Sequence, residues 1–248
     1  MLTGTPISGS DQNFVLCFII NLGYLGKLKH DFLNSISRMT QMNSSQIRSL
    51  YKWALIDRIR INQYRLRRSV KSMFVAYRRG ESILSISSRY DLPPVSIFRA
   101  LLSYGGRSKK DVKRIINQPE FLKPYDRDQL LLAFENDEIA VTAQQNVLQL
   151  REAQAFENEI EAILQKKGIS YKTEKILAKS QIKNIGIAIS TPDFLLSKEY
   201  LLQGKKIHWI ECKSYFGASI PILQEKLWKQ TQRYVEHWGP GLVVFKHG

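Results

Sequence analysis

The chain has 248 residues, of which 44% are hydrophobic, and this length and composition exclude long disorder and allow one large or two modest domains. Lysine and arginine number 37 against 22 acidic residues, which gives a formal net charge of +15 and a pI of about 9.8. The two cysteines, Cys17 and Cys212, exclude a disulfide framework, and no zinc-ligand spacing can be made from them.

Residues 1–26 are expected to form a tail. Their apolar run, residues 14–20, is shorter than the roughly 20 residues that a membrane-spanning helix needs. It also lacks the basic residues that open a secretory signal. We therefore expect a soluble intracellular protein of the nucleus or the cytoplasm, without a membrane partner.

Residues 27–116 are expected to form an all-α, helix-turn-helix-like region that binds nucleic acid. Between Lys27 and Arg114 there are 20 basic and 5 acidic residues, so this stretch alone carries a charge excess equal to that of the whole chain. Such a local excess attracts polyanions by Coulomb forces and counterion release. DNA is favoured over RNA as the partner. A solvated basic face and an anionic membrane surface are the alternatives.

Helix signals divide this region. A first helical unit is predicted over residues 27–60, with a turn and N-cap at residues 43–45, and a second unit starts near Tyr64 and ends at Gly80. Ser82 then caps a short helix, a proline turn follows at residues 91–94, and a further helix runs to Tyr104.

The order of short helix, tight turn and helix is typical of a helix-turn-helix unit. In such a unit Arg99 would face outward from the last helix, and Arg107, Lys109 and Lys110 would follow at once to clamp phosphates. These four residues are the predicted nucleic-acid contacts. A plain scaffold or a protein-docking module is the alternative.

Residues 117–150 are interpreted as a helical connector, and residues 151–248 as a separate domain. A helix is predicted from Asn146 to Lys167, with Glu157 beside its buried face. A short strand and a short helix are expected over residues 169–181, before the chain enters a pair of longer strands.

Two extended runs that follow predict a hairpin. Asp193 opens the first strand, and the second strand carries Glu211, Cys212 and Lys213. Because side chains alternate along a strand, Glu211 and Lys213 share one face, where Asp193 on the adjacent strand can meet Glu211. Cys212 faces the opposite side, into the packing.

Phosphodiester hydrolysis suits this trio. Two carboxylates at one point hold Mg²⁺ by hard oxygen ligands, and the metal lowers the pKa of a bound water. A neighbouring lysine can orient or deprotonate that water and offset negative charge. The alternative is a strand-edge salt bridge between Glu211 and Lys213.

A helix over residues 222–235 is predicted after this strand. It places Gln230 and Tyr234 one turn apart on the same face, where they could order Lys213, the water or a phosphate. An ordinary polar helix face is the alternative. A last strand, residues 242–245, is expected to join the sheet beside the Glu211 strand.

This order of elements resembles the PD-(D/E)xK nuclease superfamily. Within it, the segments STPDFLL, IHWIECKSYFG and WGPGLVVF are similar to the codanin-interacting nuclease family, which is also described by its Thr-Pro-Asp motif. The resemblance implies a restriction-endonuclease-like α/β core, with a mixed central sheet flanked by helices. It also implies cleavage of nucleic acid dependent on Mg²⁺ or Mn²⁺, and a codanin-like partner.

The same resemblance implies roles for individual residues. Asp193, Glu211 and the backbone carbonyl of Cys212 would bind the metal, and Lys213 would be the catalytic lysine. Glu157 would complete the acidic site, with the further additions Gln230 and Tyr234. Because family members continue beyond the last strand, a C-terminal truncation is expected.

Two other classes of function stay open at this stage. The chain could be a catalytically silent adaptor that keeps the nuclease fold and acts through its partner. It could also be a helix-turn-helix transcription regulator with an unrelated α/β domain.

Overall fold

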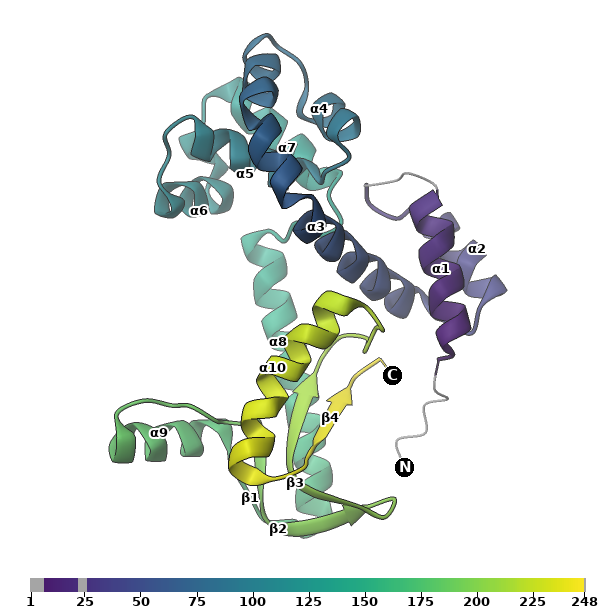
Figure 1. Cartoon of the computed structure of the whole chain (residues 1–248), viewed down its shortest axis with the longest axis vertical. Coiled ribbons are helices and arrows are strands. Elements are labelled where there is room, and N and C mark those ends of the chain that lie inside the picture. The colour runs from purple at the N-terminus through teal and green to yellow at the C-terminus, as the bar shows by residue number, and fades with distance from the viewer. Residues whose placement is uncertain (1–6, 22–25, 248) are drawn as a thin grey trace. The chain divides into compact units, whose positions relative to one another are not determined.

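A computed structural model describes residues 7–21 and 26–247 (Figure 1). They divide into two compact units, Ser8–Val147 and Leu148–Gly248. This division lies within one helical turn of the expected domain boundary at residues 150 and 151. Among the described residues, no helix is both long and apolar enough to cross a membrane.

The first unit is all helical. Its elements are α1 (Gly9–Asn21), α2 (His30–Met39), α3 (Ser44–Arg78), α4 (Ile83–Tyr90), α5 (Pro94–Tyr104), α6 (Lys109–Asn117), the 3-10 helix η1 (Pro119–Phe121) and α7 (Pro124–Glu135). The tail expected over residues 1–26 was therefore wrong for Gly9–Asn21. This segment is helical because α1 packs on α3 and Val15 is fully buried. Residues 1–6 and 22–25 lie outside the described residues.

Helix α3 is one continuous element of 35 residues, so the predicted break near Tyr64 was wrong. The predicted N-cap is confirmed: Oδ1 of Asn43 accepts the N–H of Gln46 at 3.0 Å, and Oε1 of Gln46 accepts the N–H of Asn43 at 2.8 Å. No glycine or proline interrupts the sequence until Gly80, which has a φ of +92° and ends the helix.

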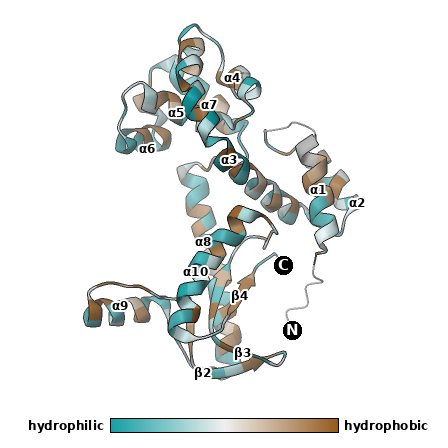
Figure 2. Ribbon diagram, viewed as in Figure 1, coloured by the Kyte–Doolittle hydropathy of each residue, from teal (hydrophilic) through white to brown (hydrophobic). Residues whose placement is uncertain are grey.

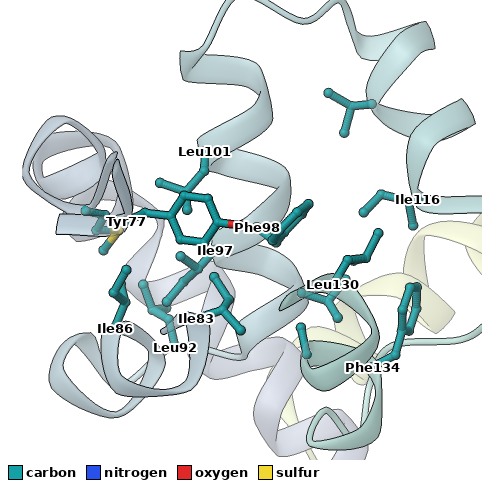
Figure 3. Packing of buried hydrophobic residues seen from close by; sticks show 14 residues of the cluster. Tyr77, Ile83, Ile86, Leu92, Ile97, Phe98, Leu101, Ile116, Leu130 and Phe134 are labelled. Carbon is teal, nitrogen blue, oxygen red and sulfur yellow. The ribbon is translucent and has the colours of Figure 1, made fainter. Parts of the chain in front are cut away.

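The predicted succession of two short helices after α3 is confirmed. Ser82 caps the start of α4 by accepting the N–H of Ser85 at 3.2 Å. Asp91 is the C-cap residue and adopts a left-handed backbone conformation with a φ of 56°. Helix α5 then begins at Pro94. Both helices are amphipathic and bury their apolar sides in one core, where the ten labelled side chains of Figure 3 meet. A three-residue turn therefore joins two helices that share a core.

The segment interpreted as a connector is instead part of this core. Leu130 and Ala133 of α7 are fully buried among residues of α4 and α5. Asp137, just after α7, is buried and accepts the N–H of Val95 at 3.0 Å, which caps the start of α5. Residues 117–137 therefore complete the helical unit, because their apolar side chains find partners that are distant in sequence.

The second unit is α/β. It contains α8 (Ala143–Lys166) from Leu148 onward, β1 (Tyr171–Thr173), α9 (Glu174–Ile185), β2 (Phe194–Leu202), β3 (Lys205–Lys213), α10 (Pro221–Trp238) and β4 (Leu242–Phe245). The strands form one mixed sheet in the order β1-β2-β3-β4, antiparallel except for the parallel pair β3 and β4. The predicted hairpin and the position of β4 beside β3 are confirmed.

One face of this sheet packs against α8. Phe156, Ile160 and Leu164 of α8 meet a set of buried strand residues made up of Phe194, Leu196, Ile210 and Cys212. Trp209, the β3 residue before Ile210, contacts α10 instead: its ring stands edge-on to that of Tyr234, with ring centroids 5.2 Å apart. The sheet is therefore held by α8 through alternate residues of β2 and β3, and α10 reaches the residues in between.

Candidate active site

Asp193 and Glu211 lie opposite each other where β2 begins and β3 ends. The hairpin register pairs Phe194 with Ile210. Asp193, the residue just before β2, therefore lies alongside Glu211 of β3. Oδ2 of Asp193 accepts the backbone N–H of Cys212 at 2.6 Å. The two carboxylates predicted to meet are therefore neighbours, and the hairpin register determines their positions.

Glu211 is buried, with 4% of its surface exposed. Its Oε1 accepts two hydrogen bonds, from Nζ of Lys213 and from Nε2 of Gln230, both at 2.6 Å. Its Oε2 is buried and has no hydrogen-bond partner among the described residues. Glu211 and Lys213 thus share one face of β3, as alternation predicts, and one carboxylate oxygen is left with unmet acceptor capacity.

Gln230 and Tyr234 come from α10 and lie one turn apart. Helix α10 starts with Pro221 at its first position and stops before Gly239. Nε2 of Gln230 donates to Oη of Tyr234 at 3.0 Å, and that hydroxyl donates to the carbonyl of Thr191 at 3.4 Å. The predicted pair therefore forms a chain of hydrogen bonds from Glu211 to the loop before Asp193.

Glu157 of α8 approaches the site from its open side. It lines a cavity of about 540 Å³ together with Asp193, Thr173 and Glu174. Its Oε2 accepts from Nε2 of Gln154 at 3.2 Å. The structure thus brings Glu157 to a cavity shared with Asp193, where it contributes charge.

Burial and like charge raise the pKa values of the acids here. Burial, followed by the charge of Glu211, raises the pKa of Asp193 to about 7. Burial also raises the pKa of Glu157, and the charges of Glu174 and Glu211 add to that effect. For Tyr234, burial and then Glu211 raise the pKa to about 12. The four acids Glu157, Glu174, Asp193 and Glu211 therefore outnumber the two lysines near them, Lys175 and Lys213.

A hard cation fits this donor set. The unpartnered Oε2 of Glu211 and the raised pKa of Asp193 are both relieved by a positive charge placed between them. Among the described residues, no group of three His, Cys, Asp or Glu side chains could hold a metal ion. A bound cation would therefore complete its shell with backbone carbonyls, water or substrate oxygens.

The structure adds one residue that the sequence analysis did not single out. Glu174, the first residue of α9, lines the same cavity as Asp193, and its N–H donates to the carbonyl of Asp193 at 3.1 Å. Its place depends on the pairing of β1 with β2, for which the sequence carries no clear signal.

The predicted nucleic-acid contacts belong to the other unit. Arg99 lies on α5, Lys109 and Lys110 begin α6, and Arg107 lies in the turn between these helices. All four residues are exposed. Their exposure is what a phosphate contact requires, and their contact with nucleic acid stays a prediction.

Fold and site together define an α/β unit with buried paired carboxylates and a lysine at the end of a mixed sheet. A sequence profile described as "Protein of unknown function TPD sequence-motif" matches residues 123–248, which is half of the chain. The chain belongs to this family. It carries the motif as Thr191, Pro192 and Asp193, so the loop that leads into the candidate site bears the family's signature.

Curated relatives match over shorter stretches. The uncharacterized protein L539 of Acanthamoeba polyphaga mimivirus is 32% identical over 103 residues, which is 40% of this chain and 36% of that protein. CDAN1-interacting nuclease 1 is 32% identical over 105 residues in Mus musculus, covering 40% of this chain and 34% of the relative. In Gallus gallus it is 39% identical over 61 residues, covering 23% and 21%. The alignments thus span little more than a third of these relatives or less. No solved structure matches the chain.

Proposed function

We propose that this protein is a metal-dependent nuclease of the PD-(D/E)xK type, which hydrolyses phosphodiester bonds of nucleic acid, with DNA favoured over RNA. The observation that carries the proposal is the buried, unpartnered Oε2 of Glu211, which lies beside Asp193 and Lys213. An acceptor left without a partner in a buried site is costly unless a cation or a substrate group meets it. The printed name of the vertebrate relatives supports the same class of activity.

Mg²⁺ or Mn²⁺, when bound, would polarise the phosphate and lower the pKa of an attacking water. Asp193, Glu211 and the backbone carbonyl of Cys212 are the proposed ligands. Gln230 holds Oε1 of Glu211, which would leave Oε2 available to a bound cation. Lys213 is placed to donate hydrogen bonds to a phosphate oxygen or to the water, and Glu157 adds negative charge on the cavity side.

We also propose a codanin-like partner and a nuclear or cytoplasmic location. The support is the name of the relatives, which states that they interact with CDAN1. Co-precipitation of the purified chain with codanin tests this point separately from catalysis.

Cleavage assays on matched variants test the nuclease proposal. Wild type, Asp193→Asn and Glu211→Gln are compared on labelled single-stranded, duplex and branched DNA and on RNA, with Mg²⁺, Mn²⁺ or EDTA. Glu225→Gln on α10 is the control, because Glu225 is exposed and forms a surface ion pair with Lys229. Wild type and control should cleave with metal, and both site variants should lose at least about 100-fold.

A second readout separates the site from its activity. Mn²⁺ should raise the melting temperature of the wild type but not that of Glu211→Gln, because a ligand that binds only the folded state stabilises it. If the protein binds nucleic acid but cleaves none of the substrates with any of the metals, the nuclease proposal is wrong and the catalytically silent adaptor is favoured.

A further inference from the structure

The long helix α3 carries nine basic residues and one acidic residue, Asp57. In Figure 2 much of this helix is coloured as hydrophilic. One apolar side of the helix, which includes Leu55, Met73 and Tyr77, is buried against neighbouring helices. The side of α3 opposite these residues therefore has no part in the core.

The basic residues of α3 fall into two groups. In the first half of the helix the three arginines are paired: Arg48 with Glu138, Arg58 with Asp91, and Arg60 with Asp57. In the second half Arg67, Lys71 and Arg78 form no ion pair with any acid that the structure describes. The second half of the helix therefore keeps charge that these ion pairs do not compensate.

The uncompensated residues share one face. Tyr64, Arg67, Lys71 and Arg78 follow each other at intervals of three, four and seven residues, which keeps them within roughly one quadrant of the helix over about 21 Å. All four are exposed. Nη1 of Arg68 donates to Oη of Tyr64 at 3.1 Å, with its guanidinium 5.3 Å from the ring centre. A straight basic row with one aromatic ring is the result.

We propose that this face of α3, formed by Tyr64, Arg67, Arg68, Lys71 and Arg78, binds the phosphate backbone of duplex nucleic acid. The proposal rests on the proposed function for the class of ligand, and it names a second surface for it. A rigid row of unpaired cations is matched by a regular row of phosphates, and counterion release supplies the binding energy. An anionic membrane fits less well, because Met73 and Tyr77 are buried and the exposed apolar residues Ile61 and Val75 stand among charged residues one turn away.

Binding of a labelled 30-base-pair duplex in EDTA, followed by fluorescence anisotropy, tests this surface without cleavage. The 248-residue chain is compared with the triple variant Arg67→Gln, Lys71→Gln and Arg78→Gln. Glutamine keeps helix propensity close to that of arginine and lysine, and circular dichroism checks that α3 is retained. A matched triple variant, Arg99→Gln, Arg107→Gln and Lys110→Gln, removes the same charge from α5 and α6.

The α3 variant should bind at least about tenfold more weakly, and its slope of log affinity against log salt should fall by about 2 to 3. The α5–α6 variant should change less on both measures. An α3 variant that keeps the duplex affinity and the salt slope of the unaltered chain would overturn the inference, whatever the second variant does. So would an α3 variant that loses retention on phosphatidylserine vesicles while it keeps duplex affinity. Because cleavage is assayed apart, inactive protein that still binds through α3 would refute only the nuclease.

Discussion

Gln230 donates a 2.6 Å hydrogen bond to Oε1 of Glu211, and this contact ties helix α10 to the end of strand β3. The other hydrogen of the same amide reaches Tyr234 at 3.0 Å. One side chain thus fixes the orientation of the buried carboxylate and the direction of the tyrosine hydroxyl. We regard Gln230 as a positioning residue for Glu211.

Replacement of Gln230 should therefore affect both stability and the acid it holds. Gln230→Ala should lower the free energy of unfolding by about 1–3 kcal/mol, because it leaves Oε1 with one partner fewer in a buried site. Gln232→Ala removes an exposed bond to Glu236 and should cost only a few tenths of a kcal/mol. Urea unfolding of the two variants measures the difference. Equal losses would show that the Gln230 contact has no special weight.

Lys213 neutralises a buried acid, and its side chain is itself only 15% exposed. Lys213→Met should destabilise the metal-free protein by about 3 kcal/mol, since the buried Glu211 would lose its ion pair. Cleavage should fall by roughly 100- to 10,000-fold. Lys229→Met breaks an exposed pair with Glu225 and should cost under about 1 kcal/mol. Addition of Mn²⁺ should recover part of the stability of Lys213→Met, and calorimetry with and without the metal measures this recovery.

The stability of the metal-free protein should depend on pH through Asp193. Its pKa is raised to about 7, so between about pH 4 and pH 7 the folded protein binds more protons than the unfolded chain. The free energy of unfolding therefore falls as the pH rises through this window. Asp193→Asn should remove this contribution. The difference in unfolding free energy between Asp193→Asn and wild type should therefore shift by about 1–3 kcal/mol in favour of the variant between about pH 4 and about pH 8. Parallel pH profiles in EDTA would contradict this assignment.

Asp137 should be the residue outside the core side chains on which the helical unit depends most. Its Oδ1 accepts the N–H groups of Ile139 and Ala140, and its Oδ2 accepts that of Val95. Asp137→Ala would leave these donors without partners and should lower the free energy of unfolding by about 3 kcal/mol or more. Asp128→Ala on α7, with a side chain 71% exposed, is the control and should be nearly neutral. A near-neutral result for Asp137→Ala would return residues 117–137 to the role of a connector.

The sequence by itself determined the elements whose signals are local. Asn43 and Ser82 mark helix starts, and Gly80 marks a helix end, because caps and left-handed residues act within a few positions of themselves. Alternation along a strand placed Glu211 and Lys213 on one face for the same reason. The break predicted near Tyr64 failed because no residue there stops a helix, so the local signal itself had been misread.

Only the tertiary structure decided which distant segments meet. The burial of Leu130 and Ala133 against α4 and α5, the approach of Glu174 to Asp193, and the bond from Gln230 to Glu211 all join residues that local spacing does not connect. Each of these contacts depends on strand register and on the fit between apolar faces. Local sequence patterns allow more than one register and more than one fit, and only the packing of the whole unit selects among them. The carboxylates could therefore be named from the sequence. The side chains that orient them, and the Glu211 oxygen that has no hydrogen-bond partner among the described residues, follow from the packing of α10 and α8 on the sheet.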